Sequence, residues 1–391
     1  MSQLAGGAHD AAPRRDGLLC ALLGAQLVAV ALFPLHAAGR GAPAWLVAFA
    51  GATAALGVAA LAGAWRRAPW SRWAAVVLAA VALVAVAYGV AGGLGAVRLG
   101  ASTAVSVALL AVAFRGAQPL GDVVTGGQRA FYAAVLALAA WVAARGLLDP
   151  ARLAAIIPLD VPPLHARFLG AMYLSGATFM LLALRARAWR EVRIVTAMVA
   201  LWTGMLGLVS LRFIHAFDWH RPPTWTWFVA YSAFPIVAAW LAWRQRGRTG
   251  GGGGASVAPA LRRWLGVQGV AVTALAVALL VAPAAVAAVW PWKVTPPLAQ
   301  IYSAPFLAYG LGSLACARAA AWVEVRIAVA ATVVFTAAVL AASWHHRALF
   351  APAAPASWLW FGGFAVATAA GSWFLWTGRV SARSDPREVR A

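Results

Sequence analysis

Two hexapeptides, Trp189-Arg-Glu-Val-Arg-Ile194 and Trp322-Val-Glu-Val-Arg-Ile327, stand 133 residues apart, and each opens an apolar run. The same shift superposes residues further along the two runs. These pairs are Thr203 and Thr336, Trp225 and Trp358, Trp227 and Trp360, Trp240 and Trp373, and Trp243 and Trp376. Tryptophan is rare, and self-similarity at one fixed period indicates a duplicated structural unit. The sequence therefore predicts a second repeat at 126–248 and a third at 259–379.

The first 125 residues resemble the same unit more weakly. Phe33-Pro34-Leu35 resembles Ile157-Pro158-Leu159, and Gly51-Ala52-Thr53 resembles Gly176-Ala177-Thr178. We expect residues 1–125 to be a diverged four-helix repeat, 249–258 a Gly-rich cytoplasmic linker and 380–391 a cytoplasmic tail. Because each repeat has an even number of spans, the copies share one orientation and are related by an axis along the membrane normal.

The composition is that of a membrane protein. The chain has 391 residues, of which 63% are hydrophobic and 10% charged, and its mean hydropathy is +0.81. A membrane-spanning helix needs about 20 apolar residues, so we predict an all-α polytopic integral membrane protein with about 12 transmembrane helices. The apolar runs are 17–37, 43–65, 73–94, 99–114, 130–148, 166–184, 194–214, 224–243, 264–290, 299–317, 327–344 and 357–377.

The net charge of +21 is a topology signal. With twelve spans and a cytoplasmic N-terminus, 22 of the 31 Lys and Arg residues fall on the cytoplasmic side. This bias favours cytoplasmic N- and C-termini and contact with anionic headgroups. It explains the positive charge without a nucleic-acid partner. All basic residues but Lys293 are arginine, and alanine dominates the apolar positions, which is typical of a GC-rich bacterial genome. We expect the bacterial cytoplasmic (inner) membrane.

The acidic residues avoid the middle of every predicted span. All ten lie at a terminus, in a loop or at a span end, whereas buried ionisable residues are the usual markers of ion pathways. A carrier that depends on a mid-membrane carboxylate is therefore disfavoured. The two cysteines, Cys20 and Cys316, lie in separate apolar runs and predict neither a disulfide framework nor a thiolate metal cluster. We predict no cofactor and no bound metal.

Polar and aromatic residues gather in the outer loops instead and form a candidate ligand site. Histidine with a carboxylate can ligate zinc or transfer protons, whereas tryptophan at this depth is typical of an interfacial belt. The interfacial interpretation is favoured, and no catalytic residue is assigned. The candidate residues are His215, Asp218, His220, Trp225, Trp227, Asp160, His165, Trp290, Trp292, Lys293, His345 and His346.

The charged residues of the two hexapeptides form candidate structural pairs. Glu191 with Arg193, and Glu324 with Arg326, lie at the cytoplasmic start of equivalent spans. We expect them to pair across the copies and to hold the repeats together.

One box carries a resemblance. The stretch Trp290-Pro-Trp-Lys-Val-Thr-Pro-Pro-Leu298 and its partner, which begins Ile157-Pro-Leu-Asp-Val-Pro-Pro-Leu164, resemble a box in uncharacterised multi-pass membrane proteins of GC-rich bacteria. The second copy departs from it because it lacks Trp-Pro-Trp. The resemblance implies a multi-pass membrane protein and no particular activity.

Three functions stay open from the sequence. Repeats around the membrane normal favour a transporter-like protein for a neutral or amphipathic substrate. The lack of buried charge is also typical of a non-enzymatic scaffold or lipid-organising protein. A membrane enzyme at the outer face, which would use His215, Asp218 and His220, is the least favoured. A small molecule or a lipid is the expected ligand, and the sequence identifies no protein partner.

Overall fold

The computed structural model describes residues 17–28, 44–66, 68, 70–92, 96–115, 120–247 and 254–383. In these residues the chain is all-α, and the only β-structure is two isolated bridges. Within the same residues, nine helices are long and apolar enough to cross a membrane. The chain is thus a multi-pass membrane protein. The predicted tail beyond residue 383 and half of the predicted Gly-rich linker, 249–253, lie outside the described residues.

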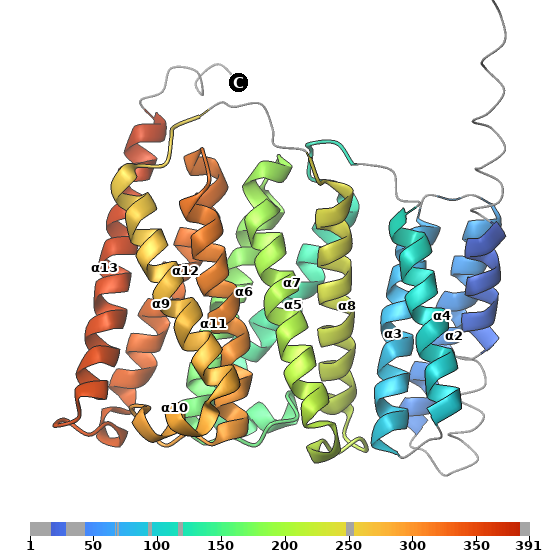
Figure 1. The fold of residues 1–391 in the computed structure, drawn as a ribbon, viewed down its shortest axis with the longest axis horizontal. Helices are drawn as coiled ribbons and strands as arrows, with labels where there is room; N and C mark the ends of the chain where they lie inside the picture. Colours follow the sequence, from blue (N-terminus) through green and yellow to red (C-terminus); the bar gives the residue numbers. More distant parts are fainter. Residues whose placement is uncertain are drawn as a thin grey trace, which may run out of the picture. The chain divides into compact units, whose positions relative to one another are not determined.

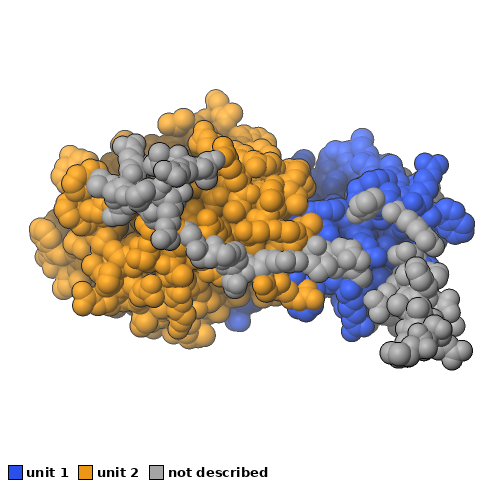
Figure 2. Space-filling view, turned by 90° about the horizontal axis from the view of Figure 1, so that it is seen from above, with its two compact units in different colours: residues 1–119, 211–244 blue, residues 120–210, 245–391 orange. Residues whose placement is uncertain are grey.

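The chain divides into two compact units, residues 1–119 with 211–244 and residues 120–210 with 245–391, which Figure 2 shows in blue and orange. The units and the predicted repeats divide the chain differently, since the last helix of the second predicted repeat belongs to the first unit. The helices of the first unit are Gly17–Val28, α2 Ala44–Trp65, α3 Ser71–Ala91, α4 Ala96–Arg115, the 3-10 helix Ile214–Ala216 and α8 Pro222–Arg244.

The second unit holds the longer run of helices, most of α7 among them (Figure 1). Its elements are α5 Gly126–Leu148, the 3-10 helix Pro150–Ala155, α6 Pro163–Arg185, α7 Trp189–Arg212, α9 Pro259–Val281, α10 Pro283–Val289, α11 Pro296–Ala317, α12 Trp322–His345, the 3-10 helix Arg347–Leu349 and α13 Pro355–Arg383.

Proline sets several helix starts in this unit. Pro163, Pro259, Pro283 and Pro296 each occupy the first turn of a helix, where the missing N–H costs no hydrogen bond. One of these prolines divides a predicted span. The run 264–290 is not one helix, because Pro283 breaks it and Ala282 leaves helical geometry with φ −130° and ψ 51°.

Glycine lets two helix pairs of the second unit approach backbone to backbone. A Cβ on Gly146 of α5 would lie 2.6 Å from the Ala166 carbonyl oxygen and 2.8 Å from the Cα of Gly170 on α6. Likewise, a Cβ on Gly310 of α11 would lie 2.6 Å from the backbone nitrogen of Thr273 on α9. Small residues at helix crossings are the usual means of close packing in membranes.

One long helix of the second unit buries several polar side chains. α11 has 22 residues and is long enough to span, yet it is not among the nine apolar spans because it carries Gln300, Tyr302, Ser303, Tyr309 and Ser313. All five of these side chains are buried. By contrast, the large apolar side chains that α9 and α13 expose are valine, leucine and tryptophan. The polar groups of α11 therefore face the interior of this unit, whereas large apolar groups of α9 and α13 face outward.

Candidate functional site

A cluster of five aromatic rings, which we call the aromatic cage, lies at one end of the second unit. It consists of Phe168 on α6, Tyr302 on α11, Trp360 on α13, and Trp290 and Trp292 from the segment between α10 and α11. The Trp292 and Trp360 ring centroids are 4.7 Å apart, and the rings of Phe168 and Tyr302 are 4.9 Å apart, both edge to face. This geometry is the favourable one for aromatic pairs.

His165 joins the cage through two hydrogen bonds. Its Nε2 is 3.0 Å from the Lys293 carbonyl oxygen, and its Nδ1 is 2.7 Å from the Tyr302 hydroxyl oxygen. A carbonyl only accepts, so in the neutral ring Nε2 carries the proton and Nδ1 accepts from Tyr302. The result is a directed relay from the Tyr302 hydroxyl through His165 to the Lys293 carbonyl.

A second relay of the same kind lies seven residues further along α11, two turns away on the same helix face. Ser175 donates to the Ala331 carbonyl oxygen of α12 at 2.7 Å. Because its proton is used there, the serine oxygen accepts from the Tyr309 hydroxyl, with which it is in contact. The two tyrosines of α11 thus bind α6 side chains at two depths.

Two indole N–H groups of the cage stand apart from these relays. The Nε1 atoms of Trp290 and Trp292 are buried and have no hydrogen-bond acceptor among the described residues. Trp360, in contrast, donates to the Ser343 hydroxyl at 2.9 Å. A buried donor without an acceptor costs about 1–3 kcal/mol, so these two N–H groups mark where an acceptor atom of a ligand or of water would be stabilised.

The structure divides the predicted outer-face residues between the two units. His165, Trp290 and Trp292 come together in the cage, and Lys293 contributes its carbonyl while its side chain is exposed. Asp160 is exposed, and the ring centroids of His345 and His346 are 4.9 Å apart. His165 is not a loop residue as predicted: it lies in the first turn of α6 and is buried, because Pro162 and Pro163 start the helix before it.

The other predicted residues lie in the first unit, around the start of α8. His215, Asp218 and His220 are exposed, and Asp218 accepts the His220 backbone N–H at 2.9 Å. Trp225 and Trp227 are buried among other rings. In the described part of the chain, no group of three His, Cys, Asp or Glu side chains could hold a metal ion.

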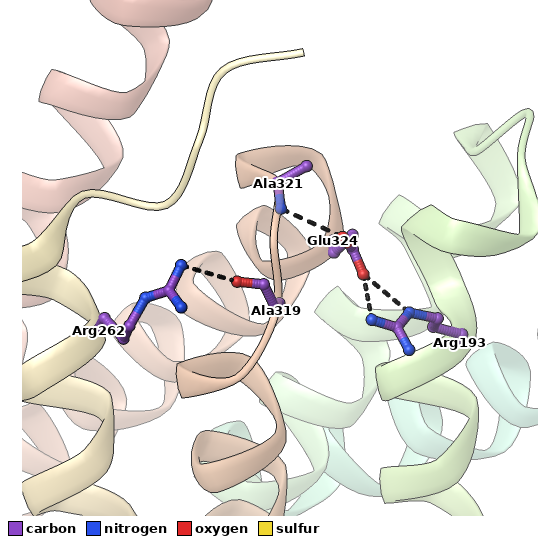
Figure 3. Close-up of polar contacts among 5 residues, drawn as sticks. All are labelled: Arg193, Arg262, Ala319, Ala321 and Glu324. Atoms are coloured by element: carbon purple, nitrogen blue, oxygen red, sulfur yellow. Dashed lines mark hydrogen bonds and ion pairs between the residues drawn. The ribbon is translucent and has the colours of Figure 1, made fainter. Parts of the chain in front are cut away.

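The charged pairs of the second unit are reciprocal. Arg193 of α7 binds Glu324 of α12, and Arg326 of α12 binds Glu191 of α7. Each glutamate also accepts a backbone N–H that precedes its own helix: Glu324 binds that of Ala321 at 3.2 Å, as Figure 3 shows beside the Arg262–Ala319 contact, and Glu191 binds that of Ala188 at 2.9 Å. One carboxylate therefore caps a helix and links it to another.

Sequence reasoning did not select Phe168, Ser175, Arg167 or Tyr309 as site residues. Arg167 donates to Nε2 of His346 at 2.7 Å, and a guanidinium has no acceptor, so this imidazole is neutral with its proton on Nδ1. Ser175 and Tyr309 gave no signal, because such residues occur singly in many membrane helices.

Acid is expected to weaken the Arg167–His346 contact. Burial, then the positive charge of Arg167 and then that of His345, lower the pKa of His346 below its ordinary value. The unfolded chain protonates first, so the stability from this contact is complete above about pH 6.5. It is lost as the pH falls toward the lower pKa of the folded protein.

The measurement is the unfolding temperature of the purified protein between pH 8 and pH 5. His346→Gln, which can still accept from Arg167 but does not titrate, should flatten the decline. The control His345→Gln removes only the smallest of the three causes and should keep most of the decline. Equal declines in wild type and His346→Gln would contradict the prediction.

Comparison of the chain with protein-family models, with curated proteins and with solved structures finds no match.

Proposed function

We propose that this protein is a transporter-like membrane protein which binds a small neutral or amphipathic molecule at the aromatic cage. The observation that carries the proposal is the pair of buried, unpaired indole N–H groups on Trp290 and Trp292, inside a cluster of rings. A bound molecule with a hydrogen-bond acceptor oxygen would satisfy these donors, and its apolar part would contact the rings. Small-molecule sites commonly combine apolar walls with a few oriented polar groups.

The buried polar face of α11 supports passage as well as binding. Tyr302 and Tyr309 present hydroxyl groups two turns apart toward α6, where they bind His165 and Ser175. Polar residues at membrane depth are expensive unless they face the protein interior, where they often mark a substrate path. A molecule that exchanges hydrogen bonds with these two relays would cross without a fixed charge in its path, which fits a neutral substrate.

Transport is tested by uptake into proteoliposomes, with protein-free vesicles as the reference and a panel of labelled neutral sugars, amides and aromatic amides as solutes. Trp292→Phe removes one unpaired donor, and Tyr302→Phe removes the first relay. Each is expected to lower the uptake of a transported solute about tenfold, since one hydrogen bond to a substrate contributes about 1.4 kcal/mol.

The matched control is Tyr132→Phe. This change also removes one buried tyrosine hydroxyl, which contacts Thr196 at 2.8 Å between α5 and α7 and takes no part in the relays. Uptake by this variant should equal that of the wild type. If no solute enters faster than it enters protein-free vesicles, or if all three variants transport like the wild type, the proposal is wrong.

We also propose that the chain contains three parallel four-helix repeats with twelve spans. Hydrogen bonds that occur twice, between residues 133 positions apart in number, support the duplication of the second and third repeats. The Val124 N–H binds the Arg187 carbonyl as the Val257 N–H binds that of Ala320, and Arg129 and Arg262 bind the carbonyls of Ala186 and Ala319. α11, α4 and the shorter apolar helix Gly17–Val28 would bring the nine spans to twelve.

The charge bias supports a proposal for location and orientation. With 22 of 31 basic residues on one side, both termini would be cytoplasmic, and the membrane would be the bacterial inner membrane with anionic headgroups against the basic side. In this orientation the aromatic cage lies at the outer face, and the reciprocal ion pairs lie at the cytoplasmic face. A reporter fused to the C-terminus tests the orientation, and an external signal would overturn it.

A further inference from the structure

Three basic side chains, which we call the basic cluster, meet beside the aromatic cage. Arg167 lies on α6, and His345 and His346 lie at the end of α12. Nη1 of Arg167 is 2.7 Å from Nε2 of His346, and the ring centroids of His345 and His346 are 4.9 Å apart. The charges of Arg167 and His345 both act on His346. Positive charge therefore accumulates at this point of the second unit.

No carboxylate forms an ion pair with the basic cluster within the part of the chain that the structure describes. The described ion pairs of the second unit join other arginines to Asp149, Glu191 and Glu324. The Arg167 guanidinium uses one N–H for His346, so four of its five donors stay available among the described residues. Its side chain is only partly buried, and its fork of N–H groups matches the oxygens of a phosphate or a carboxylate.

The two imidazoles add donors to this fork. Because Nε2 of His346 accepts from Arg167, the proton of the neutral ring is on Nδ1, and this N–H can donate to a ligand. His345 beside it is exposed and offers a further ring N–H. Donors from two helices, one of them a fixed cation, repel a cationic ligand and favour an anion. A phosphate group has enough acceptor oxygens to bind all three side chains at once.

The internal repeat does not require these residues. Alignment of the two Pro-Pro-Leu sequences places Ile301 of the third predicted repeat at the position of Arg167, and the shift of 133 places Phe213 of the second at that of His346. By contrast, the charged residues that join the repeated helices, such as Glu191 and its equivalent, occur in both copies. A structural role shared by the copies therefore does not explain the basic cluster.

We propose that the basic cluster binds a phosphate group, either of a free small molecule or of a lipid headgroup. Arg167 directly precedes Phe168 of the cage, and His346 follows Ser343, the acceptor of the Trp360 N–H, by three residues. The site thus lies within about one helical turn of the cage. It uses none of the rings or relays of the cage, so it does not depend on the proposed transport function.

Binding is tested on the purified full-length protein in an uncharged detergent, with inorganic phosphate as the probe and sodium chloride at equal ionic strength as the reference. Calorimetric titration should show phosphate binding to the wild type. The affinity should be at least about tenfold lower for Arg167→Gln, which removes the fixed charge and the fork. Arg167→Lys keeps the charge but loses the fork, and its affinity should lie between the two.

The matched control is Arg152→Gln. Arg152 belongs to the same unit, but its side chain is 76% exposed and pairs with Asp149 at 3.6 Å. The phosphate affinity of this variant should equal that of the wild type.

A second arm distinguishes the two sources of the phosphate group. If the occupant is an anionic lipid, phosphatidylglycerol added to phosphatidylcholine nanodiscs should raise the unfolding temperature of the wild type and of Arg152→Gln, but not that of Arg167→Gln. If the occupant is a free small molecule, phosphatidylglycerol should have no effect while inorganic phosphate still binds. Either result supports the site. If neither probe affects the wild type, or if Arg167→Gln and Arg152→Gln respond alike, the proposal is wrong.

Discussion

Gly146→Val is expected to cause the largest loss of stability, about 3 kcal/mol or more, and to reduce sharply the yield of monodisperse protein. The new Cβ would lie 2.6 Å from the Ala166 carbonyl oxygen and 2.8 Å from the Cα of Gly170. These obstacles are backbone atoms, which cannot rotate away as a side chain can, so α5 and α6 would have to separate. Overpacking of a rigid contact costs at least about 1–3 kcal/mol. The measurement is thermal unfolding in detergent.

Gly266→Val on α9 is the matched control. A Cβ at this glycine meets no atom within 4 Å, so valine should change the stability by less than about 0.5 kcal/mol. Equal unfolding temperatures for the two valine variants would show that α5 and α6 do not make this backbone contact.

Glu324→Gln is expected to have the second-largest effect, a loss of about 2 kcal/mol. The change leaves Arg193 without its ionic partner and weakens the cap on the Ala321 N–H. Breaking a mostly buried charge pair costs about 3–5 kcal/mol. Here the arginine side chain is 37% exposed, and solvent screening lowers the loss. Glu191→Gln should behave alike, since Glu191 makes the same two kinds of contact with Arg326 and Ala188.

The control for this change is Asp149→Asn. Asp149 pairs with Arg145 at 3.3 Å, but the two side chains are 35% and 43% exposed, and exposed pairs contribute less than about 1 kcal/mol. Chemical or thermal unfolding of the three variants ranks the effects. A loss for Glu324→Gln no larger than that for Asp149→Asn would refute a stabilising role for the reciprocal pairs.

Helix positions followed closely from the sequence because each is a local property. An apolar run of about 20 residues forms a helix in a membrane whatever its neighbours are, since its backbone must be hydrogen-bonded within the segment. The run 264–290 was predicted as one span because hydropathy does not register Pro283, which removes a helical hydrogen bond and ends α9. α11 shows the reverse case, a helix whose buried polar residues lower its hydropathy.

The candidate site could be predicted from the sequence less well than the helices. Trp290, Trp292 and His165 were selected as members of outer loops, whereas their common feature is the cage that Phe168, Tyr302 and Trp360 complete. Tyr302 lies 137 positions from His165 along the chain. No spacing rule connects residues so far apart, because their distance depends on how α6 and α11 pack. Ser175 and Tyr309 were missed for the same reason.

The sequence by itself determined an all-α membrane protein, the approximate spans and the positions of charge at their ends. The hydrophobic effect acts on each segment through its own composition. Only the tertiary structure decided that Arg193 binds Glu324 and that His165 accepts from Tyr302. It also decided that Trp225 and Trp240 of α8 are buried while Trp358 and Trp373 of α13 are exposed. Hydrogen bonds, ion pairs and ring contacts act over a few ångströms, so their partners exist only once distant helices have packed together.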